Sequence, residues 1–155
     1  MAITKLPQTF YATYRASGSF SGVVGDCIEI IGSETAPVTV KVIEVASSVA
    51  QNLSIVKRSA ADTGGTSAAA TLVALDSRQE AASAVVKTYT VAPSAGAAVG
   101  TINTYKLGAD QILVQTYTDQ NAVPVKLRGA AQTLAVVIDA IGTIKWAVEF
   151  TEGEP

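Results

Sequence analysis

"TIKWAVEFTE", residues 143–152, decides the fold class of this chain because its large apolar side chains occur at every second position. Ile144, Trp146, Val148 and Phe150 are separated by small, polar or charged residues. Successive side chains of a β-strand point to opposite faces of the sheet, so this period of two predicts a strand with one buried face. The chain therefore contains at least one sheet that covers a hydrophobic core.

The same signal recurs upstream and predicts a chain built from eight or more short strands. Residues 123–128 alternate in the same way, and Pro124 near their start favours an edge position. Residues 134–138 predict a strand buried on both faces, because Val137 points away from its apolar neighbours. Further runs rich in Val, Ile, Thr and Tyr, bounded by Gly, Pro, Ser or Asp, span residues 26–31, 38–46, 53–58, 84–91 and 112–118.

One of these runs changes its apolar face part-way along. In residues 38–46 the apolar phase passes from Val38, Val40 and Val42 to Ile43 and Val45. A single extra residue in a strand has this effect, and so does burial on both faces. We favour the β-bulge.

These elements predict an all-β fold, an antiparallel β-sandwich that is jelly-roll-like, with an extended N-terminal arm. A helix is hard to place, and the best candidate, residues 77–84, would make two turns at most. The regular strand-to-helix alternation of α/β folds is missing. The length of 155 residues suits one domain, which we place at residues 26–155, with the arm at residues 1–25.

The predicted arm is rich in aromatic residues. Phe10, Tyr11, Tyr14 and Phe20 lie in it, and the segment shows little alternation. Because aromatic side chains are enriched at the centres of protein interfaces, these four residues are candidate contacts with a neighbouring chain. The alternative, left open here, is that the arm folds back onto its own sandwich.

The composition excludes several classes of function. Net charge is −2 and only 15% of residues are charged, so we expect no nucleic-acid partner. The chain has no histidine and one cysteine, Cys27, which we interpret as a buried strand residue; we expect no metal and no disulfide. No long apolar run lies between Lys5 and Arg15, so we expect neither a signal peptide nor a membrane span, and synthesis in the cytoplasm.

"IVKRSAADTGGTS", residues 55–67, has the ingredients of a phosphate-binding loop in the wrong order. Such loops place their glycines before the lysine and open a helix, whereas here Lys57 and Arg58 precede Gly64 and Gly65. We interpret the glycines as a turn in which φ is positive. The two cations are then ordinary strand-end residues, and an interfacial salt bridge is the most they would form.

No catalytic constellation emerges from the sequence, and we expect no enzyme, no cofactor and no small-molecule substrate. A histidine triad cannot be built without histidine. The remaining option is a pair of carboxylates, from among Glu29, Glu34, Glu44, Asp76 and Glu80. Each occupies the polar phase of a strand or a turn, which is typical of a solvated surface.

Several stretches together resemble a family of small virion structural proteins of tailed bacteriophages. They are "GDCIEIIGS" (25–33), "VKRSAADTGGTS" (56–67), "LDS" (75–77), "VKTYTVAP" (86–93), "VGTI" (99–102), "LRGAAQTLAV" (127–136) and "VEFTE" (148–152). The resemblance covers residues 25–152. Leu75 and Phe150 depart from the pattern, where members often carry His and Trp.

The resemblance implies an all-β virion component without catalytic residues. The first expectation is a capsid decoration or cement protein, a homo-oligomer and by analogy a trimer, whose partner is the major capsid protein or another virion protein. The alternatives are a tail, collar or baseplate component, or a receptor- or glycan-binding module. The expected location is the virion.

Overall fold

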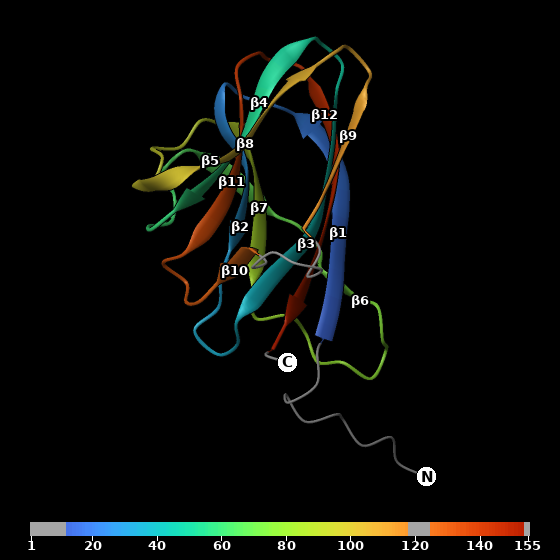
Figure 1. Cartoon of the computed structure of the whole chain (residues 1–155), viewed down its shortest axis with the longest axis vertical. Coiled ribbons are helices and arrows are strands. Elements are labelled where there is room, and N and C mark those ends of the chain that lie inside the picture. Colours follow the sequence, from blue (N-terminus) through green and yellow to red (C-terminus); the bar gives the residue numbers. More distant parts are fainter. Residues whose placement is uncertain (1–11, 118–124, 154–155) are drawn as a thin grey trace.

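The computed structural model describes residues 12–117 and 125–153, and these residues form two antiparallel sheets packed face to face. The chain passes repeatedly from one sheet to the other (Figure 1). The expected all-β sandwich is confirmed. In the described ranges there is no helix, and so none that is long and apolar enough to cross a membrane.

The first sheet has β12 at its centre. Its order is β10-β3-β12-β1-β6, and β9 pairs with β3 beyond the end of β10. Its strands are β1 (Ala12–Ser21), β3 (Val38–Ser47), β6 (Val73–Ala74), β9 (Ile112–Thr116), β10 (Val125–Leu127) and β12 (Thr143–Glu152). The edge position predicted for residues 123–128 is confirmed for β10, whereas Pro124 lies outside the described residues.

The second sheet has the order β5-β7-β2-β11-β4-β8. Its strands are β2 (Gly25–Ile31), β4 (Gln51–Arg58), β5 (Thr66–Ala69), β7 (Val85–Val91), β8 (Ala98–Leu107) and β11 (Thr133–Ile138). All its pairings are antiparallel. β11 is buried on both faces for most of its length, as its sequence predicted.

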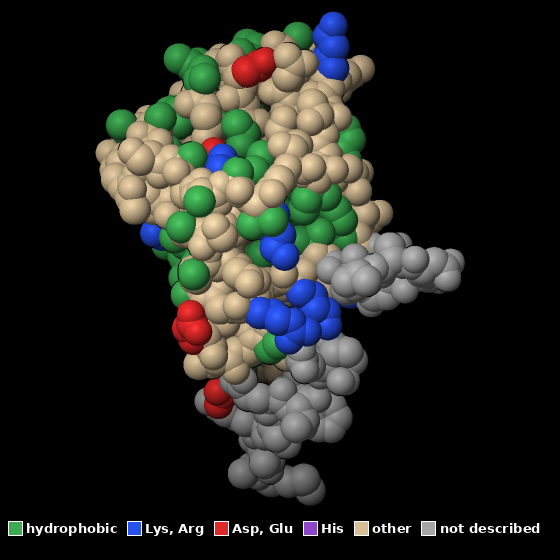
Figure 2. Space-filling view, turned by 60° about the vertical axis from the view of Figure 1, so that its left-hand side comes forward, with side chains coloured by type: hydrophobic (Ala, Val, Ile, Leu, Met, Phe, Trp, Pro, Cys, Tyr) green, Lys and Arg blue, Asp and Glu red, His purple; other side chains and the backbone are tan. Residues whose placement is uncertain are grey.

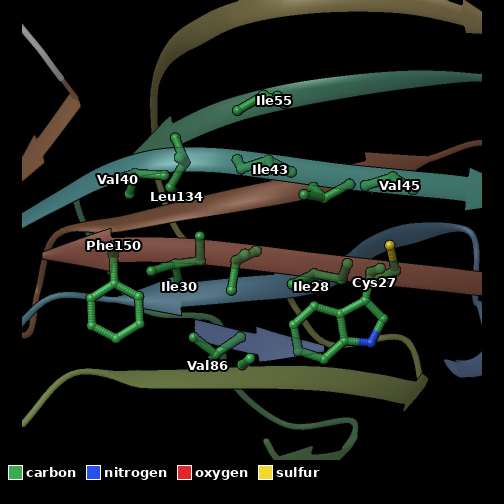
Figure 3. Packing of buried hydrophobic residues seen from close by; sticks show 14 of the residues in the cluster. Cys27, Ile28, Ile30, Val40, Ile43, Val45, Ile55, Val86, Leu134 and Phe150 are labelled. Atoms are coloured by element: carbon green, nitrogen blue, oxygen red, sulfur yellow. The ribbon is translucent and has the colours of Figure 1, made fainter. Parts of the chain in front are cut away.

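The core lies between the two sheets and is made of the alternating apolar residues. Ile144, Val148 and Phe150 of β12 are buried there in one cluster with Ile28 and Ile30 of β2, and Figure 3 shows Phe150 together with the two β2 side chains. Aliphatic side chains from the two inner faces interdigitate, and removal of this apolar surface from water is the main stabilising term. Cys27 is fully buried at this level, and its burial raises the pKa of the thiol.

The predicted bulge in residues 38–46 is confirmed. Val40 pairs with Phe150 and Val42 pairs with Glu149, so Lys41 is the extra residue in β3. The bulge lets Val40 and Ile43 both point into the core although they are three positions apart.

The predicted N-terminal arm is wrong for residues 12–25. β1 pairs with β12 along its whole length, from Ala12 opposite Glu152 to Ser21 opposite Thr143. The strand was hard to recognise because its inward positions are mostly small. Gly18 lies opposite Trp146, and a Cβ there would stand 3.2 Å from the indole Nε1, so the glycine makes room for the large ring.

The helix considered at residues 77–84 is also wrong. Oδ1 of Asp76 accepts a hydrogen bond from the backbone N–H of Arg78 at 3.0 Å. The backbone carbonyl of Asp76 accepts a second one from the N–H of Gln79 at 2.9 Å. This local turn competes with a helix for the same backbone donors. Glu152 then holds the following residues by accepting from the N–H groups of Ser83 and Ala84.

Candidate functional site

A cluster of ionisable side chains is buried on the second sheet, on the face turned away from the core. It lies beneath two chain segments, residues 59–65 and 92–97, which cross this face and are joined by two backbone hydrogen bonds between Thr63 and Ser94. We call these the covering segments. The cluster consists of Asp26 and Glu29 from β2, Arg58 from β4, Asp62 from the first covering segment and Tyr89 from β7.

Arg58 joins the sheet to the second covering segment. Its Nε and Nη2 atoms each donate to the carboxylate of Asp26 at 2.7 Å, and Nη1 donates to the carbonyl of Gly96 at 2.9 Å. The hydrogen bonds to Asp26 raise the pKa of the guanidinium further. A bidentate pair of this kind fixes both side chains in one geometry.

Glu29 is fully buried and joins the sheet to the first covering segment. Its Oε1 accepts from the backbone N–H of Asp62 at 2.9 Å, and its Oε2 accepts from the hydroxyl of Tyr89 at 2.8 Å. Burial, together with the hydrogen bond to Glu29, raises the pKa of the Tyr89 hydroxyl. The interpretation of Glu29 as a solvated surface residue is therefore wrong, because the covering segments exclude water from it.

Asp62 joins the two covering segments to each other. Its Oδ1 accepts from the backbone N–H of Gly96 at 2.9 Å and lies 3.9 Å from Nε of Arg58. Its Oδ2 is buried and has no hydrogen-bond partner. Burial raises the pKa of this carboxyl to about 7, with a further increase from the charges of Asp26 and Glu29.

The two candidate cations of the sequence have different surroundings. Lys57 is half-buried, whereas Arg58 is buried in the cluster, so the prediction of an ordinary strand-end residue is wrong for Arg58. The turn that follows is confirmed, since φ is 69° at Gly64 and 70° at Gly65. The sequence signal that could have revealed the cluster is the presence of Asp26 and Glu29 in a strand that is otherwise apolar.

The arrangement is suited to holding chain segments together. Apart from Oδ2 of Asp62, each polar atom of its side chains is hydrogen-bonded to another residue of the chain. The only described thiol, that of Cys27, is buried, and its burial raises its pKa. Among the residues that the structure describes, no group of three or more Cys, Asp or Glu side chains is placed to hold a metal ion. Two surface hollows lie away from this cluster. One, of about 360 Å³, is lined in part by Ile112, and the other, of about 240 Å³, is lined in part by Arg128.

Of the four candidate aromatic contacts, the structure describes Tyr14 and Phe20. Phe10 and Tyr11 lie outside the described residues. Tyr14 is only 2% exposed, stacks on Phe150 with ring centroids 5.6 Å apart, and donates its hydroxyl to the carbonyl of Glu80 at 2.7 Å. Phe20 is partly buried and packs against the core. Tyr14 is thus a core residue and not a contact for another chain.

Exposed apolar side chains also lie along two strands that meet at one edge of the sandwich. Val99 and Ile102 of β8 and Ile112 and Val114 of β9 are exposed. The two strands belong to different sheets. They are linked by a hydrogen bond from Tyr105 to Gln115, and Tyr117, which follows β9, donates to Asn103 of β8 at 2.9 Å. We call these four aliphatic residues the β8–β9 edge.

Bulges explain why two of these side chains reach solvent. β8 has two extra residues relative to β4. Ile102 lies between Thr101 and Asn103, which pair with successive residues of β4. Val99 lies in the same way between Ala98 and Gly100. A bulge redirects the extra side chain and interrupts the ladder. The face in Figure 2 shows hydrophobic side chains scattered widely, and Lys and Arg side chains gathered in its lower part.

Comparison of the chain with protein families, with curated proteins and with solved structures finds no match. Three stretches of the sequence supply the buried cluster: residues 25–33 hold Asp26 and Glu29, residues 56–67 hold Arg58 and Asp62, and residues 86–93 hold Tyr89. In this chain these stretches thus build a structural feature.

Proposed function

We propose that this chain is a structural protein of a bacteriophage virion, and specifically a capsid decoration protein that binds the outer face of the major-capsid lattice and stabilises the head. The observation that carries the proposal is the exposed β8–β9 edge on a sandwich with little surface charge. The resemblance of residues 25–152 to phage virion proteins gives the setting. The sandwich acts mechanically, by bridging neighbouring subunits.

The β8–β9 edge suits adhesion to another protein. Val99 and Ile112 are 66% and 73% exposed, and burial of such side chains at an interface is favourable by about 25 cal/mol per Å² of apolar area. One such contact is weak. On a particle with many identical sites, linked copies bind together and gain avidity without any new contact.

The number of copies in purified particles tests the location. A decoration protein is expected at hundreds of copies per virion, because it follows the capsid lattice. We would measure copy number by quantitative mass spectrometry against the major capsid protein. A count of a few multiples of three or six would contradict decoration and favour the tail, collar or baseplate.

Binding by the purified protein tests the surface. Val114→Asp, on β9, is expected to weaken binding to undecorated heads roughly tenfold, which corresponds to about 1.4 kcal/mol, because the interface would bury a charge without a partner. Val73→Asp is the matched control: Val73 is on β6, at the opposite edge of the same sheet, and is 57% exposed against 54% for Val114. Equal binding of both variants and the wild type would exclude the β8–β9 edge, and binding to host cells instead of heads would favour a receptor- or glycan-binding module.

A further inference from the structure

The buried cluster contains more carboxyl groups than cations. Asp26, Glu29 and Asp62 face one guanidinium, that of Arg58, and all four residues are buried. If every carboxyl group were ionised, the cluster would carry a net charge that nothing within it neutralises. An uncompensated charge shielded from water is costly, and a carboxyl group avoids the cost by retaining its proton.

The hydrogen bonds identify the carboxyl group that carries the proton. Both oxygens of Asp26 accept from Arg58. In Glu29, Oε1 accepts from the backbone N–H of Asp62 and Oε2 accepts from the hydroxyl of Tyr89. Oδ1 of Asp62 accepts from Gly96, whereas Oδ2 is buried without any donor. With a proton on Oδ2, Asp62 becomes a hydrogen-bond donor and no longer adds a negative charge beside the carboxyl groups of Asp26 and Glu29.

We propose that Asp62 is a proton-binding site that keeps the two covering segments closed over the outer face of the second sheet, and that loss of this proton loosens both segments together. This inference concerns the isolated chain and goes beyond the proposed function, on which it does not depend.

The coupling between the two segments is direct. Asp62 belongs to the first segment and is bonded to Gly96 of the second, whose carbonyl is held in turn by Arg58. The segments pack so closely that a Cβ on Gly96 would stand 1.9 Å from the carbonyl oxygen of Ala60. Movement of one segment therefore requires movement of the other.

The charged and titratable groups facing Asp62 set the direction of the pH dependence. They come from three strands: Asp26 and Glu29 from β2, Arg58 from β4 and Tyr89 from β7. Burial and the two neighbouring carboxylates give Asp62 a pKa of about 7 when the segments are closed, whereas an exposed aspartate has a pKa of about 4.

The closed state thus binds the proton more tightly than the open state. The ratio of closed to open molecules is highest at pH 4 and below. Between pH 4 and pH 7 the ratio of closed to open molecules falls by up to about tenfold per pH unit. Above pH 7 the ratio no longer changes with pH.

Amide hydrogen exchange of the full chain measures this equilibrium. The N–H groups of Gly96, Thr63 and Ser94 all take part in closure. We expect their protection factors, corrected for the intrinsic rate at each pH, to fall together between pH 5 and 7 and to be constant above pH 8. The carboxyl carbon resonance of Asp62 is expected to titrate near pH 7. Protection that does not depend on pH, or a carboxyl carbon that titrates below pH 5, would overturn the proposal.

Asp62→Asn distinguishes a proton donor from an ionised acceptor. The amide keeps the oxygen that accepts from Gly96 and offers an N–H where the protonated acid has an O–H. We expect this variant to be protected at pH 8 as strongly as the wild type is at pH 5, with no pH dependence. Asp139→Asn is the matched control, because the Asp139 carboxylate accepts from Asn52 at an exposed site; it should keep the wild-type pH profile.

Lower protection of Asp62→Asn than of the wild type at every pH would contradict the proposal, since an ionised Asp62 would then be the closing group. If the variant fails to fold, the titration of the wild-type carboxyl carbon still decides.

Discussion

Arg58 and Arg78 form the same type of ion pair in two different surroundings. Arg58 contacts Asp26 through Nε and Nη2 at 2.7 Å each, and Arg78 contacts Asp76 through the same two atoms at 3.2 and 2.8 Å. The first pair is buried beneath the covering segments and the second is exposed on a turn. Solvent screens the exposed pair, so the contribution of each pair to stability depends on burial more than on geometry.

Arg58→Met is expected to lower the free energy of unfolding by about 3–5 kcal/mol, because it leaves Asp26 buried without its cation and the carbonyl of Gly96 without a donor. Arg78→Met, the matched control, is expected to leave stability unchanged. Urea unfolding followed by circular dichroism measures both. Equal unfolding midpoints for the two variants would show that the buried pair contributes no more than the exposed one.

At the scale of the element, single extra residues determine which side chains the strands bury. Lys41 in β3 separates two inward pairs, Val38 with Val40 and Ile43 with Val45. β8 also contains extra residues, but there the extra residues are themselves apolar: Val99 and Ile102 are exposed to solvent. A strand has a strict period of two, so one inserted residue exchanges the two faces beyond it.

Deletion of Lys41 is therefore expected to preserve the fold. Without it, the four inward residues of β3 fall at every second position, and the pairing with β12 becomes regular. Deletion of Glu44 should instead turn Val45 towards solvent and destabilise the protein strongly. Thermal unfolding of the two deletion variants checks this; the prediction is wrong if deletion of Lys41 is as damaging as deletion of Glu44.

At the scale of the whole molecule, the two ends of the described chain lie side by side. Ala12 at the start of β1 pairs with Glu152 at the end of β12, in the middle of the first sheet (Figure 1). Pairing of these partners closes a loop that contains the whole intervening chain, and the entropy cost of such non-local pairing slows folding.

A circular permutant that joins Gly153 to Ala12 through a short Gly-Ser linker, opened between Arg78 and Gln79, is expected to refold faster than the linear chain. The linker turns the pairing of β12 with β1 into a local hairpin. The control is the linear chain of residues 12–153 with the same linker added at one end but not closed. Stopped-flow refolding gives both rates, and equal rates would mean that this pairing forms after the rate-limiting step.

The local pattern was sufficient for the strands whose two faces differ in polarity. The alternation in residues 143–152 predicted β12, the change of apolar phase in residues 38–46 predicted the bulge, and Gly64 with Gly65 predicted the turn. It failed for β1, whose inward residues are small where they face Trp146, and for β8, whose bulges interrupt its alternation.

For strands such as β12 and β3, the sequence by itself determined the strand and its apolar face, because side chains in a strand alternate whatever the partner. Only the tertiary structure decided which strands pair, that Tyr14 belongs to the core, and that Arg58, Glu29 and Asp62 are shielded from water. Burial of a polar side chain depends on what covers it. Here part of the cover is the segment around Gly96, which is distant in sequence from Asp26 and Arg58 and meets them only when the sandwich closes.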